Sequence, residues 1–281
     1  MTLPLTHQVA LGGAGFSLAP QLDEIAAVET ILAAAGAGTR IFDSSRAYAP
    51  VGDPTHNERL LRNALVDFPD VLIATKGGHF RVGESRWEVD NSRARLRRDV
   101  DDSLRALGVD RLGLFYLHRA DGSDSVDEAV RTLEDLRQAG KLTGIGLSNV
   151  TLKQLDEATL IAPVSAVQNP YSLLGGGDDA VLGRCQELGI PFFAYSPLGG
   201  SSGSLSLAAG LPRLGLVAAT RGVSVQRLAL AGLLARAAVM SVVVGAGRPA
   251  TAVDAAAAAI ERWDAAAQTA LDADLAEFHA R

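Results

Sequence analysis

The stretch VLIATK, residues 71–76, shows the pattern that recurs along this chain and indicates its fold class. Its apolar residues follow one another without polar alternation, which is the pattern of a strand buried on both faces of a parallel sheet. Similar short runs recur along the 281 residues, and amphipathic segments separate them. The runs are VAL (9–11), IFD (41–43), VLIATK (71–76), LGLFYLH (112–118), TGIGLSN (143–149), VSAVQN (164–169), PFFAYS (191–196) and MSVVVGA (240–246).

Eight strand candidates, each followed by a helical segment, predict a single α/β domain over residues 1–281. The predicted architecture is a (β/α)8 TIM barrel, a fold of typically about 250 residues. The alternative is a doubly wound open sheet, which normally carries a Gly-rich dinucleotide fingerprint after its first strand. Gly12-Gly13-Ala14-Gly15 resembles that fingerprint only in part, because the spacing differs and we expect no helix directly after it. No linker divides the chain, and we expect the Gly/Ser-rich stretch 199–207 to be a mobile loop.

Two of the predicted helices have clear ends. Ser125-Val126-Asp127-Glu128 is a capping box, and Gly140 can close the helix that follows it. An earlier helix begins near Asn91 or Ser92 and stops at Gly108. We expect one face of this earlier helix to be a solvated surface of Arg93, Arg95, Arg97 and Arg98. The Ala-rich stretch 255–259 also indicates a helix.

Composition excludes several classes of protein. The net charge of −6 and the absence of a basic stripe argue against a nucleic-acid surface. The single cysteine, Cys185, excludes an intrachain disulfide and paired-cysteine metal sites, and we expect it to pack inertly within a helix. No apolar run reaches about 18 residues, so we expect no membrane span. The first residues, MTLPLTHQVALGG, do not show a basic region followed by an apolar run, so we expect no secretory signal. We therefore expect a cytoplasmic protein, a monomer or a small homo-oligomer.

Polar side chains end six consecutive strands. In a barrel, the carboxyl ends of all strands meet at one rim, where the active sites of this fold lie. No G-x-S-x-G elbow or H-E-x-x-H metal motif occurs, and Lys76 would repel a divalent ion from Asp43 and His118. We therefore predict no metal and a site suited to proton transfer. The strand-end residues are Asp43, Lys76, His118, Ser148, Asn149, Gln168, Asn169, Tyr195 and Ser196.

The motifs at these strand ends resemble those of the aldo-keto reductases. The likeness runs from about residue 8 to residue 260, and two segments, VLIATKGG and SLRALGVDRLGLFYLHR, resemble bacterial pyridoxal or sugar dehydrogenase-like members most. The motifs are IFDSSRAY (41–48), IATKGG (73–78), LFYLHRAD (114–121), GIGLSN (144–149), AVQNPYSLL (166–174) and AYSPLGG (194–200).

The resemblance implies hydride transfer between a nicotinamide and a carbonyl or alcohol, with a catalytic tetrad of Asp43, Tyr48, Lys76 and His118. Tyr48 would be the proton donor. A free tyrosine titrates near 10, and a nearby ammonium such as Lys76 favours its phenolate. Asp43 would balance and orient Lys76. A neutral His118 would position the carbonyl oxygen and stabilise developing charge.

The resemblance also implies a cofactor, NADP(H), with NAD as a possible alternative. Ser148, Asn149 and Gln168 match positions that hold the nicotinamide carboxamide, and Tyr195 matches the residue that stacks on the ring. The 2′-phosphate end departs from the family pattern, since Thr251 and Asp254-Ala255 replace the usual Arg or Gln and Glu-Asn. Only Arg248 offers a positive charge there. The remaining implied contacts are the pyrophosphate loop Ser196, Leu198 and Gly199, the first-strand glycines Gly12 and Gly13, and Gly245.

The substrate pocket is less defined. The loop after Lys76 offers His79, Phe80 and Trp87 as walls, and we expect an open site without a long C-terminal substrate loop. Two rival functions remain. One is a regulatory barrel that binds nucleotide with little turnover, and the other is a lyase or aldolase that forms a Schiff base on Lys76.

Overall fold

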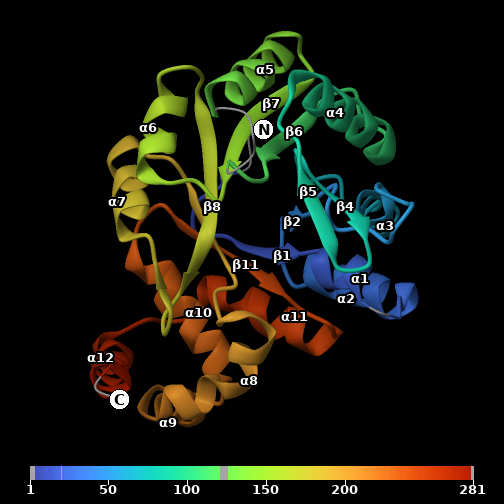
Figure 1. Ribbon diagram of the computed structural model, residues 1–281. Helices are drawn as coiled ribbons and strands as arrows, with labels where there is room; N and C mark the ends of the chain where they lie inside the picture. Colours follow the sequence, from blue (N-terminus) through green and yellow to red (C-terminus); the bar gives the residue numbers. More distant parts are fainter. Residues whose placement is uncertain (1–3, 20, 121–125, 280–281) are drawn as a thin grey trace.

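The computed structural model describes residues 4–19, 21–120 and 126–279. Within them, eight parallel strands close into a ring in the order β10, β11, β1, β2, β3, β6, β7 and β8, and β8 pairs with β10 (Figure 1). This closed ring confirms the predicted barrel and excludes the open sheet. The strands are β1 (Val9–Gly12), β2 (Ile41–Asp43), β3 (Leu72–Gly77), β6 (Leu112–Leu117), β7 (Leu142–Ser148), β8 (Val164–Ser172), β10 (Phe192–Tyr195) and β11 (Met240–Gly245).

Both faces of the strands are buried, which explains the lack of polar alternation. On β6, Leu114 and Tyr116 join the apolar cluster inside the barrel, whereas Phe115 and Leu117 pack outward with the helices. Each fully buried side chain of this kind contributes about 1.5–3 kcal/mol. The register places Lys76 of β3 beside Tyr116 of β6, one step before the rim.

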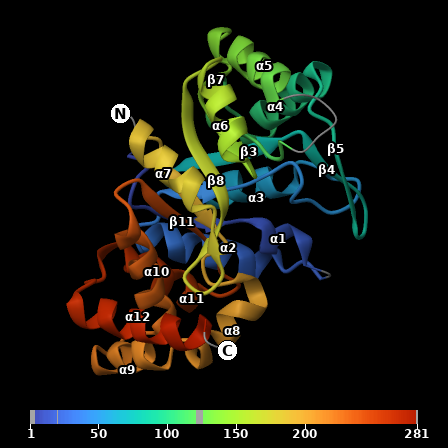
Figure 2. The same ribbon diagram turned by 60° about the vertical axis from the view of Figure 1, so that its left-hand side comes forward.

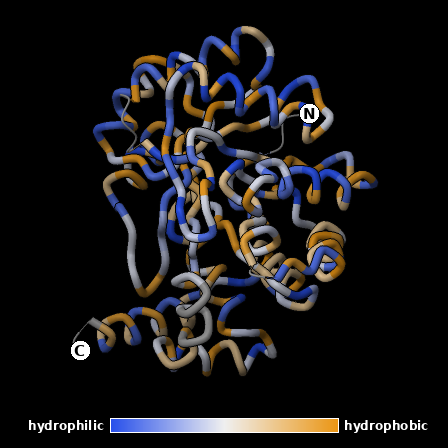
Figure 3. Tube along the Cα trace, turned by 45° about the vertical axis from the view of Figure 1, so that its right-hand side comes forward, coloured by the Kyte–Doolittle hydropathy of each residue, from blue (hydrophilic) through white to orange (hydrophobic). Residues whose placement is uncertain are grey.

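Helices surround the ring, and blue and orange residues alternate along many of them (Figure 3). Three predicted helix ends are confirmed: Ser92 caps the start of α4, and Gly108 after α4 and Gly140 after α5 are both left-handed. The predicted capping residue Ser125 lies outside the described residues. The helices are α2 (Glu24–Gly36), α3 (His56–Ala64), α4 (Arg93–Leu107), α5 (Val126–Gln138), α6 (Leu152–Thr159), α7 (Asp179–Leu188), α9 (Pro212–Thr220), α10 (Val225–Arg236), α11 (Pro249–Ala256) with the 3-10 turn Ala257–Ile260, and α12 (Ala265–His279).

Three local expectations were wrong. A short helix, α1 (Ala14–Leu18), does begin directly after Gly13. The expected loop at residues 199–207 is instead helical from residue 200 onward, as part of α8 (Gly200–Gly210). This helix buries Leu207 against α10 and its neighbours. The segment after Lys76 is an antiparallel hairpin of β4 (His79–Gly83) and β5 (Arg86–Val89), which projects from the barrel in Figure 2. In the first two cases, tertiary packing outweighs the weak helix propensity of glycine.

Other expectations concern single side chains. Arg93, Arg97 and Arg98 are exposed, as predicted, but Arg95 is not, because its guanidinium lies 3.7 Å from the centre of the Phe80 ring. Cys185 is fully buried, and burial raises the pKa of its thiol to about 12. An inert packing role fits this position. In the part of the chain that the structure describes, no helix has both the length and the apolar character needed to cross a membrane.

Candidate active site

The predicted tetrad comes together at the carboxyl rim of the barrel. Lys76 is fully buried, and its Nζ donates to Asp43 Oδ2 at 2.5 Å, to the Ser44 carbonyl at 2.9 Å and to Tyr48 Oη at 3.3 Å. These three contacts match the three protons of an ammonium. His118 follows β6, and its ring lies edge-on to Tyr48 with 5.7 Å between the ring centres. The four side chains therefore form one connected group.

The protonation states of these side chains depend on their burial and on the Lys76 ammonium. Burial raises the pKa of Tyr48, and the Lys76 ammonium offsets only part of that rise. Burial alone would lower the pKa of Lys76, but Asp43 and Tyr48 outweigh it, so that pKa is raised. Burial and then Lys76 lower the pKa of His118 well below its ordinary value. At neutral pH the site therefore holds a phenol, an ammonium and a neutral imidazole.

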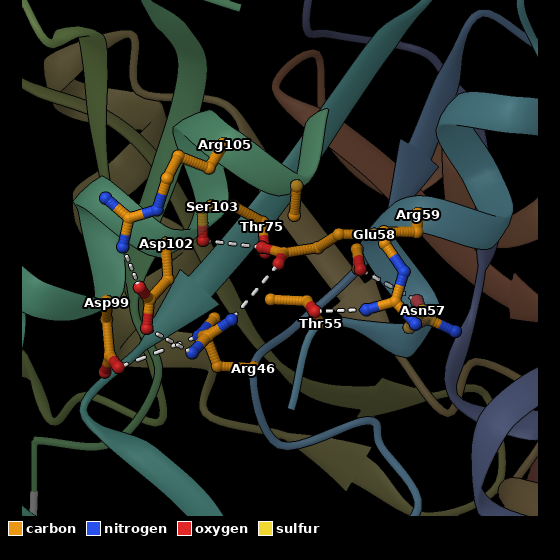
Figure 4. A network of polar contacts seen from close by, with 12 residues as sticks. Arg46, Thr55, Asn57, Glu58, Arg59, Thr75, Asp99, Asp102, Ser103 and Arg105 are labelled. Atoms are coloured by element: carbon orange, nitrogen blue, oxygen red, sulfur yellow. Dashed lines mark hydrogen bonds and ion pairs between the residues drawn. The ribbon is translucent and has the colours of Figure 1, made fainter. Parts of the chain in front are cut away.

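Tyr48 lies on a short loop, residues 44–48, that a buried ion cluster anchors. Arg46 is 2% exposed. Its guanidinium lies 2.8 Å from Asp102, 3.5 Å from Glu58 and 3.7 Å from Asp99 (Figure 4). Its backbone N–H also donates to the Lys76 carbonyl at 3.0 Å. The loop is thus tied to α3, α4 and β3 at once.

The carboxylates of this cluster are themselves held in place. Thr75 and Ser103 donate to Glu58 Oε1 at 2.7 and 2.6 Å, and Asp99 accepts from the Gly78 backbone N–H at 2.9 Å. Burial raises the pKa of Glu58, and Arg46 opposes that rise. Sequence reasoning missed this cluster. Its only signal was an arginine between Asp43 and Tyr48.

A second buried network joins the first two strand ends. Asn57 of α3 accepts from Ser44 Oγ and donates to the Gly13 carbonyl, each at 2.8 Å. Gly13 does not line the cleft; a Cβ added there would lie 2.6 Å from Asn57 Oδ1. Close packing therefore requires glycine at this position. Asn57 was not predicted, because nothing on its helix indicates that it reaches the strand ends.

A cleft with a volume of about 680 Å³ opens above the tetrad. Lys76 lies beneath its floor, and Gly199 and Arg248 each adjoin a lining residue, so these three predicted positions do not line it directly. Arg119 of the cleft wall was not predicted. The predicted residues that do line the cleft are Gly12, Asp43, Tyr48, His118, Ser148, Asn149, Gln168, Tyr195, Ser196, Leu198 and Gly245.

The polar wall of the cleft is tightly organised. Asn149 and Ser196 have backbone φ angles of 57° and 51°, in a region that residues other than glycine seldom adopt. The Tyr195 hydroxyl donates to Asn149 Oδ1 at 2.7 Å, and Gln168 Nε2 donates to Asp43 Oδ1 at 3.0 Å. Backbone strain held by surrounding contacts often marks a binding site. Here both strained residues line the same cleft.

Two helices begin at the cleft edge without a side-chain cap. Helix α8 starts after Gly199, which is left-handed, and α11 starts after Arg248, which makes no capping hydrogen bond. Gly200 and Gly247, beside these starts, line the cleft. Helix N-termini favour anions because their backbone N–H groups and dipoles point outward. Arg248 is exposed and adds a positive charge near the second start.

The expected substrate walls lie beside the cleft rather than among its lining residues. The His79 ring stands edge-on to His118 at 4.8 Å, and Trp87 donates to the Ala47 carbonyl at 3.3 Å. Phe80 faces Arg95. The hairpin thus supports the Tyr48 loop.

Comparison with known proteins identifies the family of this chain. The Aldo/keto reductase family model matches residues 8–273. Pyridoxine 4-dehydrogenase of Escherichia coli is 34% identical over 225 residues, which cover 77% of this chain and 75% of that protein.

Two solved structures resemble the fold. A glycerol dehydrogenase from Gluconobacter oxydans has a TM-score of 0.82 and 26% identity, covering 99% of this chain and 94% of that one. An aldo-keto reductase from Klebsiella pneumoniae in complex with NADPH has a TM-score of 0.78 and 23% identity, covering 94% and 89%. The likeness to the Klebsiella structure concerns the fold alone. Because the family model spans most of the chain, this protein belongs to the aldo/keto reductase family and is an oxidoreductase.

Proposed function

We propose that this protein interconverts an aldehyde or ketone and the corresponding alcohol, with NADP(H) as cofactor and Tyr48 as general acid and base. The observation that carries the proposal is the position of Lys76 Nζ, which donates to both Asp43 and Tyr48 at the floor of the cleft. When bound, the nicotinamide supplies or accepts the hydride. The chain's own residues hold the carbonyl and move the proton.

Each member of the tetrad has a distinct role in this proposal. In reduction, Tyr48 gives its proton to the developing alkoxide, and the Lys76 ammonium stabilises the phenolate that remains. Asp43 keeps Lys76 charged. Neutral His118 donates to the carbonyl oxygen without competing for the proton. In alcohol oxidation, the same groups act in reverse.

The cofactor assignment rests on the fit of the cleft to a dinucleotide. The uncapped starts of α8 and α11 suit the pyrophosphate and the 2′-phosphate, and Arg248 is the cation we assign to the latter. The related Klebsiella structure holds NADPH. We expect fluorescence titration to show tighter binding of NADPH than of NADH. Arg248→Ala should abolish most of the difference, and equal affinities in the wild type would contradict the role of Arg248.

Tyr48→Phe tests the catalytic assignment. We expect the variant to bind NADPH with unchanged affinity and to lose at least about 10²-fold in kcat, the lower range for general acid catalysis. Tyr171→Phe is the matched control, because Tyr171 is buried on β8 but does not line the cleft. It should retain turnover. Near-native carbonyl reduction by Tyr48→Phe would refute the proposal, and lack of turnover in the wild type would favour the regulatory barrel.

The substrate panel follows from the relatives. One relative is a pyridoxine 4-dehydrogenase and one structural neighbour is a glycerol dehydrogenase. We therefore propose testing pyridoxal, small polyols, sugars and aromatic aldehydes in both directions by nicotinamide absorbance. Schiff-base chemistry on Lys76 would appear instead as borohydride trapping of substrate without nicotinamide.

A further inference from the structure

Ser45 contacts the imidazole of His118 but does not itself line the cleft. Its Oγ lies 2.8 Å from His118 Nδ1, and it accepts from the Ala47 backbone N–H at 3.0 Å. Ser45 is 1% exposed and His118 is 8% exposed. The hydroxyl of the neighbouring serine, Ser44, donates to Asn57 Oδ1 instead, at 2.8 Å. The two consecutive serines therefore form hydrogen bonds with different side chains.

The direction of the Ser45–His118 hydrogen bond follows from counting protons. A serine hydroxyl has one proton to donate and two lone pairs that accept. The Ala47 N–H takes one lone pair. Among the described residues, the hydroxyl hydrogen then finds an acceptor only at His118 Nδ1. If Nδ1 carried the imidazole proton, both lone pairs of Ser45 would accept and its buried hydrogen would stay unpaired, which is unfavourable for a buried donor.

We propose that Ser45 is a positioning residue that fixes neutral His118 in the tautomer with its proton on Nε2. With Nδ1 accepting from Ser45, Nε2 is the ring nitrogen left to meet a carbonyl oxygen in the cleft that His118 lines. Nε2 then carries the hydrogen that the donor role of His118 requires. This inference rests on the proposed function only for its kinetic consequence, because the tautomer is a property of the free protein.

The geometry also separates tautomer control from simple packing. A residue that only filled space would need no hydroxyl, whereas Ser45 Oγ lies within hydrogen-bond distance of both the Ala47 N–H and His118 Nδ1. Replacing Ser45 by Thr keeps the hydroxyl, and replacing it by Ala removes it. Comparison of the Ser45→Thr and Ser45→Ala variants therefore separates the effect of the hydrogen bond from the effect of packing.

Nitrogen-15 NMR of histidine-labelled protein without cofactor tests the inference directly. Protonated and unprotonated ring nitrogens have well-separated shifts, and His118→Asn assigns the His118 signals among the five histidines. In the wild type, we expect Nδ1 unprotonated and Nε2 protonated. Ser45→Ala should change these shifts, Ser45→Thr should restore them, and the matched control Ser44→Ala should leave them in place. A wild-type His118 protonated on Nδ1 would overturn the inference even if no variant folded.

Kinetics then measure the consequence. Loss of one neutral hydrogen bond of about 1 kcal/mol corresponds to a roughly fivefold decrease in kcat for Ser45→Ala, with the KM for the cofactor unchanged. Ser45→Thr should recover kcat. If Tyr48→Phe stayed active while the NMR result held, the proposed function would fail and the tautomer assignment would stand. If Ser45→Ala kept full kcat and unchanged His118 shifts, the inference would fail alone.

Discussion

Arg46→Met should destabilise the protein strongly, because it removes the only cation within 4 Å of the Glu58 carboxylate among the described residues. Glu58 is fully buried and cannot be rehydrated without moving the structure, whereas Asp99 keeps its ion pair with Arg95 at 3.0 Å. Breaking a buried ion pair by removing one partner costs about 3–5 kcal/mol. Asp102 is 26% exposed and should add little to that cost.

The pH dependence of this variant has a defined sign. Burial raises the pKa of Glu58 in the folded protein, and Arg46 counteracts the rise. Without Arg46 that pKa rises further, so the folded state binds a proton that the unfolded state releases. Stability then falls as pH increases from the ordinary Glu pKa through the raised one. The loss caused by Arg46→Met should therefore be smaller at pH 5 than at pH 8.

Equilibrium urea unfolding, followed by circular dichroism, measures the free energy. Arg105→Met is the matched control, because Arg105 pairs with Asp102 of the same cluster but is 70% exposed, and exposed pairs contribute at most about 1 kcal/mol. Adding Glu58→Gln to Arg46→Met should recover part of the loss. A loss below about 1 kcal/mol, equal to that of Arg105→Met, would refute the reasoning that this cluster anchors the Tyr48 loop.

Three further predictions concern the site. Lys76→Met should lower kcat by roughly 10²-fold or more. It should also move the alkaline limb of the kcat–pH profile to higher pH, because the ammonium that opposes the raised pKa of Tyr48 is gone. An unchanged profile would contradict the electrostatic effect of Lys76 on Tyr48. Gly13→Ala should destabilise the protein, since the new Cβ would lie 2.6 Å from Asn57 Oδ1, and Gly13→Ala with Asn57→Ala should suffer less from that clash in a thermal melt. Because the pKa of His118 is lowered on folding, the free energy of unfolding should decrease as pH falls below about 6.5. His118→Asn should flatten that decrease in urea titrations at pH 5 to 7, and an identical slope in both proteins would count against a buried neutral His118.

The parallel α/β pattern and the polar rim were predictable from the sequence, whereas closure into a barrel rather than an open sheet needed the structure. Runs such as VLIATK are typical of strands buried on both faces of a parallel sheet, and the polar residues that end such runs then meet at one edge. Asp43, Lys76 and His118 were predictable for that reason, as strand ends. Tyr48 needed the family resemblance, since it lies on a loop five residues beyond β2.

The neighbours of these residues and their protonation states follow from the folded structure and could not be predicted from the sequence. The ion-pair partners of Arg46 come from two separate helices, α3 and α4, and Asn57 reaches Gly13 across 44 positions of the chain. The neutral state of His118 and the protonated state of Tyr48 arise from burial, which depends on the closed packing around them. Helix α8 likewise forms where local propensity favours a loop, because packing around Leu207 supplies what glycine and serine lack.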